Sequence, residues 1–169
     1  VYWEELVRMR EQGKVRAIGL SNHRIGQLER ADAIGHVDTL QPPFSAIRRE
    51  AGERELRWCA DHGTGVIVYS PMQSGLLTGS FTAERAAQLP AGDWRTNSPE
   101  FTGEGLRRNL ALAEGLGPVA DRHDTSVAAV AVAWALAWPG VTGGIVGARS
   151  PRQVDGWLPE RMPPTRCWY

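Results

Sequence analysis

Four times along this chain an apolar run ends in small and polar residues and is followed by a helix-like segment. The four ends lie at Asn22, Gln41, Ser70 and Arg149. Strands buried on both faces form continuous hydrophobic runs, and strands that alternate with helices favour a parallel sheet of βα units. Ligands of such folds gather at the carboxyl ends of the strands. The sequence therefore predicts that its functional residues lie at these four ends.

The number of βα units also bears on the architecture. A closed barrel of eight units typically needs about 250 residues, whereas this chain has 169 residues and four such units. The sequence begins at Val1, and residues 1–12 already have a helical pattern. We therefore expect the chain to be the second half of a larger barrel, with the first half preceding it.

The pattern of apolar residues predicts the order of the elements. Strands are expected at residues 15–20, 37–40, 65–69 and 143–146. Helices are expected at residues 25–33, 53–62, 106–122 and 126–137, and a last helix begins at Pro151. Residues 72–101 are rich in Gly, Pro, Ser and Thr, and so long a segment is typical of a functional loop. The expected domain is 1–158, followed by an irregular tail at 159–169.

Composition excludes several classes of function. The 19 basic and 19 acidic residues cancel, so no overall charge attracts nucleic acid or an anionic membrane. The longest apolar stretch, 127–138, is shorter than the roughly 20 residues of a membrane span. Two cysteines and four scattered histidines form no metal motif. We expect a cytoplasmic protein that binds neither metal, nucleic acid nor membrane.

Four motifs resemble the aldo/keto reductases, barrel enzymes that transfer hydride from NADPH to aldehydes and ketones. Residues 13–22 (Gly-Lys-Val-Arg-Ala-Ile-Gly-Leu-Ser-Asn) are similar to the entry into the fifth barrel strand of that family. Gln41 matches the sixth strand, residues 69–71 (Tyr-Ser-Pro) the seventh, and residues 147–153 the segment after the eighth. The resemblance extends from residue 2 to residue 158. It implies an α/β fold, a (β/α)8 TIM barrel of which this chain supplies approximately strands 5–8.

The resemblance also implies residues that bind the nicotinamide of NADPH. The carboxamide of nicotinamide is both a donor and an acceptor, which suits the hydroxyl and amides of Ser21, Asn22 and Gln41. Tyr69 is similar in position to the aromatic residue that stacks on the nicotinamide ring. Stacking on one face leaves the other face open to a small carbonyl substrate.

The rest of the cofactor is expected to lie along two further segments. The loop after the third strand would offer backbone N–H groups to the pyrophosphate, through Ser70, Pro71, Met72, Gln73, Gly75 and Leu76. After the fourth strand, Arg149 would receive the 2′-phosphate, since a guanidinium pairs well with phosphate, and Gly147 of the same motif is a further cofactor-binding residue. Gln153 would reach the ribose and adenine, and Arg95 is a further candidate contact.

The chain also departs from the family. The catalytic Asp, Tyr, Lys and His of the family lie in the first half of the barrel, so the resemblance predicts no catalytic residue here and a need for the missing amino-terminal half-barrel. Many relatives carry an acid and an Asn that hold the adenine amine, where this chain has Gly156 and Trp157. Adenine contacts at these positions are therefore open, with stacking on Trp157 as an alternative.

Other interpretations of the same residues remain. The Ser21–Asn22 pair is also typical of a helix cap, Tyr69 of a core aromatic and Arg149 of a surface charge. A truncated, non-catalytic relative that binds nucleotide or acts as an interaction module would share these motifs. An unrelated phosphate-binding isomerase barrel would lack the stacking Tyr and the Ser–Asn pair, so the sequence disfavours it.

Overall fold

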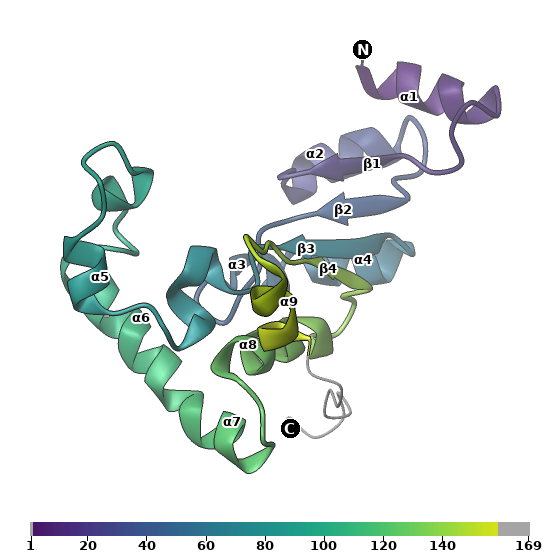
Figure 1. Cartoon of the computed structure of the whole chain (residues 1–169). Helices are drawn as coiled ribbons and strands as arrows, with labels where there is room; N and C mark the ends of the chain where they lie inside the picture. The colour runs from purple at the N-terminus through teal and green to yellow at the C-terminus, as the bar shows by residue number, and fades with distance from the viewer. Residues whose placement is uncertain (1, 159–169) are drawn as a thin grey trace.

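The computed structural model describes residues 2–158, and the expected tail at 159–169 lies outside the described residues. Its centre is a parallel sheet of four strands in the order β1-β2-β3-β4, drawn as arrows in Figure 1. The strands are β1 (Gly19–Ser21), β2 (Thr39–Gln41), β3 (Gly65–Tyr69) and β4 (Gly143–Ile145). Because each strand pairs with the next one in sequence, the chain forms four consecutive βα units, as the sequence predicts.

The helices that precede and follow the first strands cover one face of the sheet. They are α1 (Tyr2–Glu11), α2 (Ile25–Asp32), α3 (Glu50–Glu53) and α4 (Glu55–His62). The expected helix at 53–62 is present as α4 and ends at His62 as predicted, but it begins later, because the backbone leaves the helical region at Arg54 and separates α3 from α4.

A larger group of helices lies between β3 and β4 in the sequence, and one further helix, α9, follows β4. Together these are η1 (Gln73–Thr78), α5 (Ala83–Ala87), η2 (Trp94–Asn97), α6 (Gly103–Gly115), α7 (Gly117–Arg122), α8 (Val127–Ala137) and α9 (Pro151–Trp157). The expected helix at 106–122 is two helices that meet at Leu116, where Gly115, Gly117 and Pro118 weaken a continuous helix. None of the described helices is long and apolar enough to cross a bilayer.

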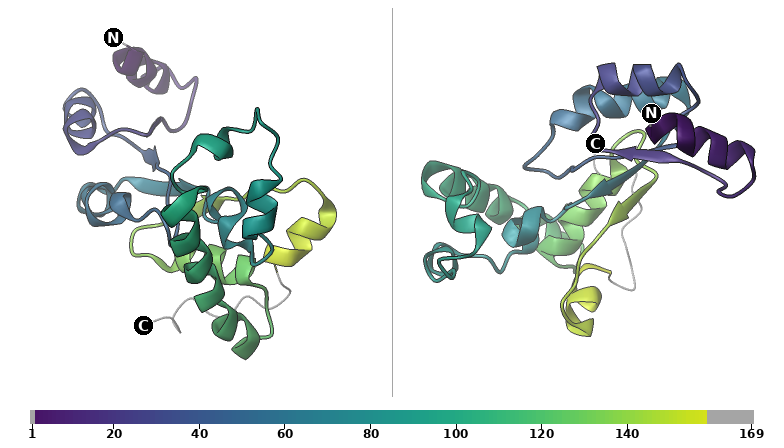
Figure 2. Two further views of the ribbon diagram at one scale, coloured as in Figure 1. Left: turned by 90° about the vertical axis from the view of Figure 1, so that its left-hand side faces the viewer. Right: turned by 90° about the horizontal axis from the view of Figure 1, so that it is seen from above.

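The core lies between the sheet and its helices. Alternate strand residues Leu20, Leu40, Val66 and Val68 are at most 5% exposed and belong to one cluster with Leu28, Leu56 and Cys59 from the helices. The intervening strand residues, such as Ser21, Gln41 and Tyr69, are exposed or half-buried. The period of two in strands produces this division, so in the described residues the sheet has one covered face and one open face (Figure 2).

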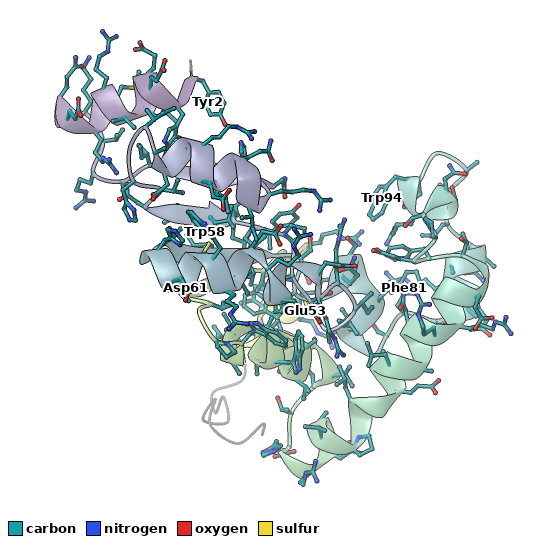
Figure 3. All side chains as sticks on the ribbon, turned by 180° about the vertical axis from the view of Figure 1, so that it is seen from behind. Tyr2, Glu53, Trp58, Asp61, Phe81 and Trp94 are labelled. Atoms are coloured by element: carbon teal, nitrogen blue, oxygen red, sulfur yellow. The ribbon has the colours of Figure 1, made fainter. Side chains whose placement is uncertain are left out.

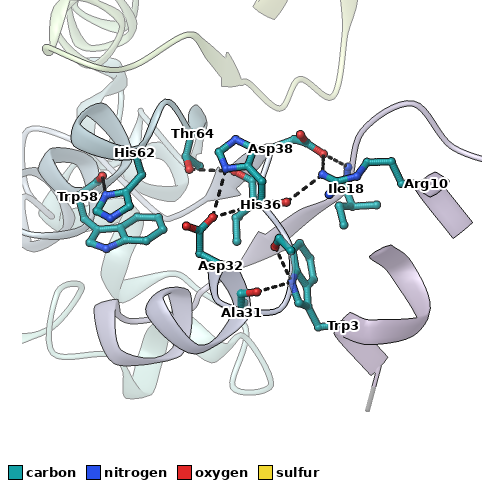
Figure 4. Close-up of polar contacts among 12 residues, drawn as sticks. Trp3, Arg10, Ile18, Ala31, Asp32, His36, Asp38, Trp58, His62 and Thr64 are labelled. Atoms are coloured by element: carbon teal, nitrogen blue, oxygen red, sulfur yellow. Dashed lines mark hydrogen bonds and ion pairs between the residues drawn. The ribbon is translucent and has the colours of Figure 1, made fainter. Parts of the chain in front are cut away.

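Side chains bond to backbone at the amino ends of the strands (Figure 4). The carboxylate of Asp38 accepts the N–H of Ile18 at 2.8 Å and pairs with Arg10 at 2.9 Å. Burial alone would raise the pKa of Asp38, but these two partners outweigh it and lower that pKa below its ordinary value. The expected strand at 15–20 is wrong at its start, since Ile18 bonds here to a side chain and the ladder begins at Gly19.

The long segment after β3 is anchored by apolar residues of its own. Leu76, Phe81 and Phe101 are buried together, and the rings of Phe81 and Phe101 meet edge to face at 5.6 Å. Instead of an irregular loop, this segment contains η1, α5 and η2. It extends away from the sheet beside α6 in Figure 1.

Candidate functional site

The carboxyl ends of the four strands meet at one edge of the sheet. Ser21 stands opposite Gln41 in the β1–β2 ladder, and Tyr69 stands opposite Ile145 in the β3–β4 ladder. A further bridge joins Pro43 to Tyr69. The polar ends that the sequence singles out are therefore neighbours in space.

Hydrogen bonds hold the first of these residues together. Tyr69 Oη donates to Asn22 Oδ1 at 2.9 Å, and Ser21 Oγ donates to the carbonyl of Gln41 at 3.0 Å. The backbone N–H of Asn22 donates to the same carbonyl at 3.2 Å. Asn22 has a φ of 60°, a left-handed conformation that Asn adopts more readily than most residues. The structure thus brings Ser21, Asn22, Gln41 and Tyr69 into one cluster.

A contact that the sequence does not reveal supports this cluster from outside. His23 Nδ1 donates to the carbonyl of Ser21 at 2.8 Å, and His23 Nε2 contacts Tyr2 Oη at 2.7 Å. Tyr2 lies on α1, far from His23 in sequence, so no local pattern signals the pair. His23 acts on the cluster through the backbone of Ser21.

A groove of about 1180 Å³ begins at Tyr69 and runs between the segment after β3 and helix α9. We call it the main groove. Nine of the residues predicted to contact the cofactor line it: Tyr69, Ser70, Pro71, Met72, Gly75, Arg95, Gly147, Arg149 and Gln153. Trp157, the alternative adenine contact, lines it as well. Ser21, Asn22 and Gln41 do not line it, and they connect to it through the Tyr69–Asn22 hydrogen bond.

The floor of the main groove has an unusual backbone. Ser70, Ser74 and Gly75 have φ values of 58°, 51° and 106°, so η1 is interrupted by residues in the left-handed region. Such conformations in residues other than Gly are uncommon and gather at ligand sites. They turn the chain sharply where it leaves β3.

The side chain of Gln73 points into the protein. It is 6% exposed; its Oε1 accepts from Ser45 Oγ at 2.8 Å, and its Nε2 donates to Glu100 Oε2 at 2.7 Å. Leu76 is also fully buried. Neither residue lines the main groove, so the structure leaves their side chains in packing roles beneath the loop.

Arg149 and Gln153 meet at the start of α9. Gln153 Oε1 accepts the backbone N–H of Arg149 at 2.6 Å, and the side chain of Arg149 is exposed on the groove. The side-chain amide oxygen of Gln153 therefore accepts a hydrogen bond within the protein, while the side-chain NH2 group remains a donor for a ligand.

The opposite wall of the main groove comes from the segment before α6, where Arg85, Trp94 and Arg95 line it. Figure 3 shows Trp94 and Phe81 on this extension of the chain. Arg95 forms two bonds to the carboxylate of Asp93, Nη2–Oδ2 at 2.6 Å and Nε–Oδ1 at 2.9 Å. These bonds, with a smaller contribution from the positive charge of Arg149, lower the pKa of Asp93 to about 2. Sequence reasoning named Arg95 but not Arg85 or Trp94, because nothing local marks them.

The part of the chain that the structure describes contains neither a cluster of metal ligands nor an exposed thiol. Within residues 2–158, no three His, Cys, Asp or Glu side chains gather as metal ligands. Cys59 is buried in the core, and burial together with Glu55 raises its pKa to about 12. Its thiol is therefore protonated at neutral pH and is a packing group.

Comparison with known proteins gives a consistent result. The model of the "Aldo/keto reductase family" matches residues 2–159. The aldo-keto reductase YhdN of Bacillus subtilis (strain 168) is 33% identical over 153 residues, covering 90% of this chain and 46% of that protein. The NADH-specific methylglyoxal reductase of Escherichia coli (strain K12) is 31% identical over 149 residues, covering 88% and 44%.

A solved structure agrees with these relatives. The glycerol dehydrogenase AKR11B4 from Gluconobacter oxydans superposes with a TM-score of 0.83 at 32% identity, over 91% of this chain and 46% of that one. This chain therefore spans about half the length of the relatives that it matches. By the match to the family model and by its parallel βα units, this chain belongs to the aldo/keto reductase family.

Proposed function

We propose that this chain is the cofactor-binding half of an NADPH-dependent oxidoreductase that reduces aldehydes or ketones to alcohols. The observation that carries the proposal is the main groove, whose lining includes both an aromatic residue, Tyr69, and a guanidinium, Arg149. A nicotinamide dinucleotide phosphate needs a flat partner for its ring and a cation for its 2′-phosphate.

The residues fit such a ligand. The volume of about 1180 Å³ is at the upper end of small-molecule sites, as an extended dinucleotide requires. No atom lies within 4 Å of the position that a Cβ would take at Gly147, so the backbone there is open to a ligand. Arg85, Arg95, Arg149 and Arg152 line the groove, and their charge suits the phosphates.

The residues of this chain would bind and orient the cofactor. When bound, NADPH supplies the hydride. Tyr69 would hold the nicotinamide ring, and Ser21, Asn22 and Gln41 would fix its carboxamide. Because Tyr69 now donates to Asn22 Oδ1, binding would exchange that bond for one from the carboxamide. Arg149 would recognise the 2′-phosphate.

The proton donor would come from outside this chain. We propose that residues 1–158 form strands 5–8 of a (β/α)8 barrel, and that the first four strands supply the catalytic Asp, Tyr, Lys and His. Two features support this. The chain matches about half of each relative, and within the described residues β1 and β4 each have one neighbouring strand. The coding sequence upstream tests the proposal: it should encode those four residues at the ends of four strands.

The preference for NADPH over NADH depends on Arg149. One relative is named as NADH-specific, so family membership alone does not decide the cofactor. Titration of the protein with each cofactor, followed by fluorescence, is the direct test. Binding of NADPH alone or much more tightly supports the proposal, and equal affinities would refute the preference.

A non-catalytic relative is the second candidate. The lining of the main groove, which contains no Lys or His, is compatible with both candidates. A non-catalytic relative predicts dinucleotide binding without turnover in the full-length protein. An assay of NADPH consumption over a panel of aldehydes and ketones separates the two candidates.

A further inference from the structure

Helix α9 forms part of the wall of the main groove. Gln153 and Trp157 are four residues apart, so they lie on the same face of the helix. Both line the main groove, as does Gly156. The lining that contains Tyr69, Arg149 and Gln153 therefore also contains an indole ring.

The orientation of Trp157 limits what it can offer a ligand. Its Nε1 atom is shielded from solvent and has no hydrogen-bond partner among the described residues, while the side chain as a whole is only half-buried. The exposed part of the indole is thus its carbon surface, and its N–H donor is turned away from solvent. Trp157 presents a flat apolar surface to the groove.

The side chains of α9 that line the main groove offer few acceptors to a base. Gly156 has no side chain, and neither a guanidinium nor an indole has an acceptor. Gln153 Oε1 already accepts the N–H of Arg149, and the carboxylate of Asp155 does not line the groove. The amino group of adenine donates in the plane of the ring, and among these side chains the one acceptor for it is the second lone pair of Gln153 Oε1.

We propose that Trp157 binds the adenine of the dinucleotide by stacking, and that the site recognises the flat shape of the base and not its hydrogen-bonding edge. The inference rests on the proposed function, since it takes the groove to hold a nicotinamide dinucleotide. Stacking on an aromatic side chain tolerates different bases because every base has a π-face. The protein should therefore accept hypoxanthine in place of adenine.

Binding measurements on the full-length protein test this without any turnover. The probes are NADPH, its hypoxanthine analogue (nicotinamide hypoxanthine dinucleotide phosphate) and the fragment adenosine 2′,5′-bisphosphate. The unmodified protein should bind NADPH and the analogue with similar Kd. Trp157→Ala should weaken all three probes by about 5- to 100-fold, the range expected for loss of one stacked base.

Three further variants sharpen the result. Trp157→Phe keeps a ring without the N–H and should retain most of the affinity. Trp157→Asn supplies an in-plane amide and should favour NADPH over the hypoxanthine analogue. Leu158→Ala is the matched control, because Leu158 is adjacent, 54% exposed and does not line the groove. Circular dichroism shows whether each variant is folded. If Trp157→Ala does not fold, the binding of Trp157→Phe is compared with that of Trp157→Asn instead.

Two results would overturn the inference while sparing the proposed function. One is unchanged binding of all probes by the Trp157 variants when Arg149→Ala weakens NADPH. The other is strong discrimination against hypoxanthine by the unmodified protein. If the unmodified protein binds no dinucleotide, the proposed function and the inference both fail.

Discussion

Tyr69 at the end of β3 donates a hydrogen bond of 2.9 Å to Asn22, the residue that follows β1. The two residues are 47 positions apart in sequence, yet the parallel sheet places them at the same edge. The bond orients the Tyr69 ring and occupies the Asn22 amide oxygen before any ligand arrives. Two roles of Tyr69, as a ring and as a donor, can therefore be separated by substitution.

Tyr69→Ala is expected to lower kcat by roughly 10²-fold, since a misplaced reacting group can cost that much, with a smaller change in the Kd of NADPH. The reason is that stacking places the ring of nicotinamide but carries no charge. Tyr69→Phe keeps the ring and should retain most of kcat. Single-turnover hydride transfer and cofactor titration measure the two quantities. Unchanged hydride transfer in Tyr69→Ala would make Tyr69 a core residue only.

Arg149→Ala is expected to weaken NADPH by about ten- to a hundredfold, equivalent to roughly 1.5–3 kcal/mol for a charged contact. NADH lacks the 2′-phosphate, so its Kd should change little. Fluorescence titration with both cofactors measures the difference. Arg107→Ala is the control, because Arg107 lies on α6 with its side chain 76% exposed and does not line the main groove. Equal weakening of both cofactors would remove Arg149 from this role.

Gln73→Ala is expected to destabilise the protein by about 1–3 kcal/mol, because it leaves the buried hydroxyl of Ser45 and the carboxylate of Glu100 without this partner. Thermal or urea unfolding measures the change. The Kd of NADPH should change less than in Arg149→Ala, since the Gln73 side chain does not line the main groove. Gln88→Ala, at an exposed position, is the matched control. A stable variant with lost cofactor affinity would contradict the packing role.

Asp93→Asn is expected to loosen the segment that carries Trp94. The pKa of Asp93 is lowered from 3.8 to about 2 by Arg95, so the charged form favours the folded segment. The stabilising effect of the Asp93 carboxylate is complete above its ordinary pKa of 3.8, and it is lost as the pH falls through the pKa of the folded protein, about 2. The protection factors of residues 94–98, which correct for the intrinsic exchange rate at each pH, should be lower in Asp93→Asn at pH 7, and in the unmodified protein near pH 2, than in the unmodified protein at pH 7. Asp61→Asn is the control, because Asp61 is exposed. If residues 94–98 are as well protected in Asp93→Asn as in Asp61→Asn at pH 7, the Asp93–Arg95 pair does not hold the segment.

The 169-residue chain on its own is expected to show no reductase activity and to self-associate. Within the described residues, β1 and β4 have one neighbouring strand each, and unpaired strand edges recruit other strands. Gel filtration, combined with an assay of NADPH consumption on a panel of aldehydes, checks both expectations. A monomer that reduces any of the aldehydes would show that no further half-barrel is needed.

The sequence predicts most reliably those features that depend on local pattern. The run Gly65–Tyr69 is continuous and β-branched, and both of its bounds agree with β3. Ser126 caps α8 through the N–H of Ala129, as its position before an apolar run suggests. The predicted start of the first strand, at residue 15, is wrong. Ile18 bonds to the side chain of Asp38, a partner 20 residues away that no local pattern reveals.

The candidate site also contains some residues that a local pattern predicts and others whose orientation depends on distant partners. Tyr69 and Arg149 were recognisable from their positions after strands, and both line the main groove. Gln73 also follows a strand, but its partners Ser45 and Glu100 lie 28 and 27 residues away and turn its side chain inward. Thr82 and Asp93 are local signals that the predicted helices leave unused, although both are typical helix N-caps. The side chain of each accepts a backbone N–H at the start of a short helix, α5 for Thr82 and η2 for Asp93.

The two rims of the sheet differ in what satisfies their polar groups. At the amino ends, the carboxylate of Asp38 and the hydroxyl of Thr64 are hydrogen-bonded within the protein, whereas the carboxyl ends of β3 and β4 open on the main groove. Damage at one rim should therefore appear as unfolding, and damage at the other as lost affinity in a protein that still folds. New specificities can evolve along the second rim while the first preserves the scaffold.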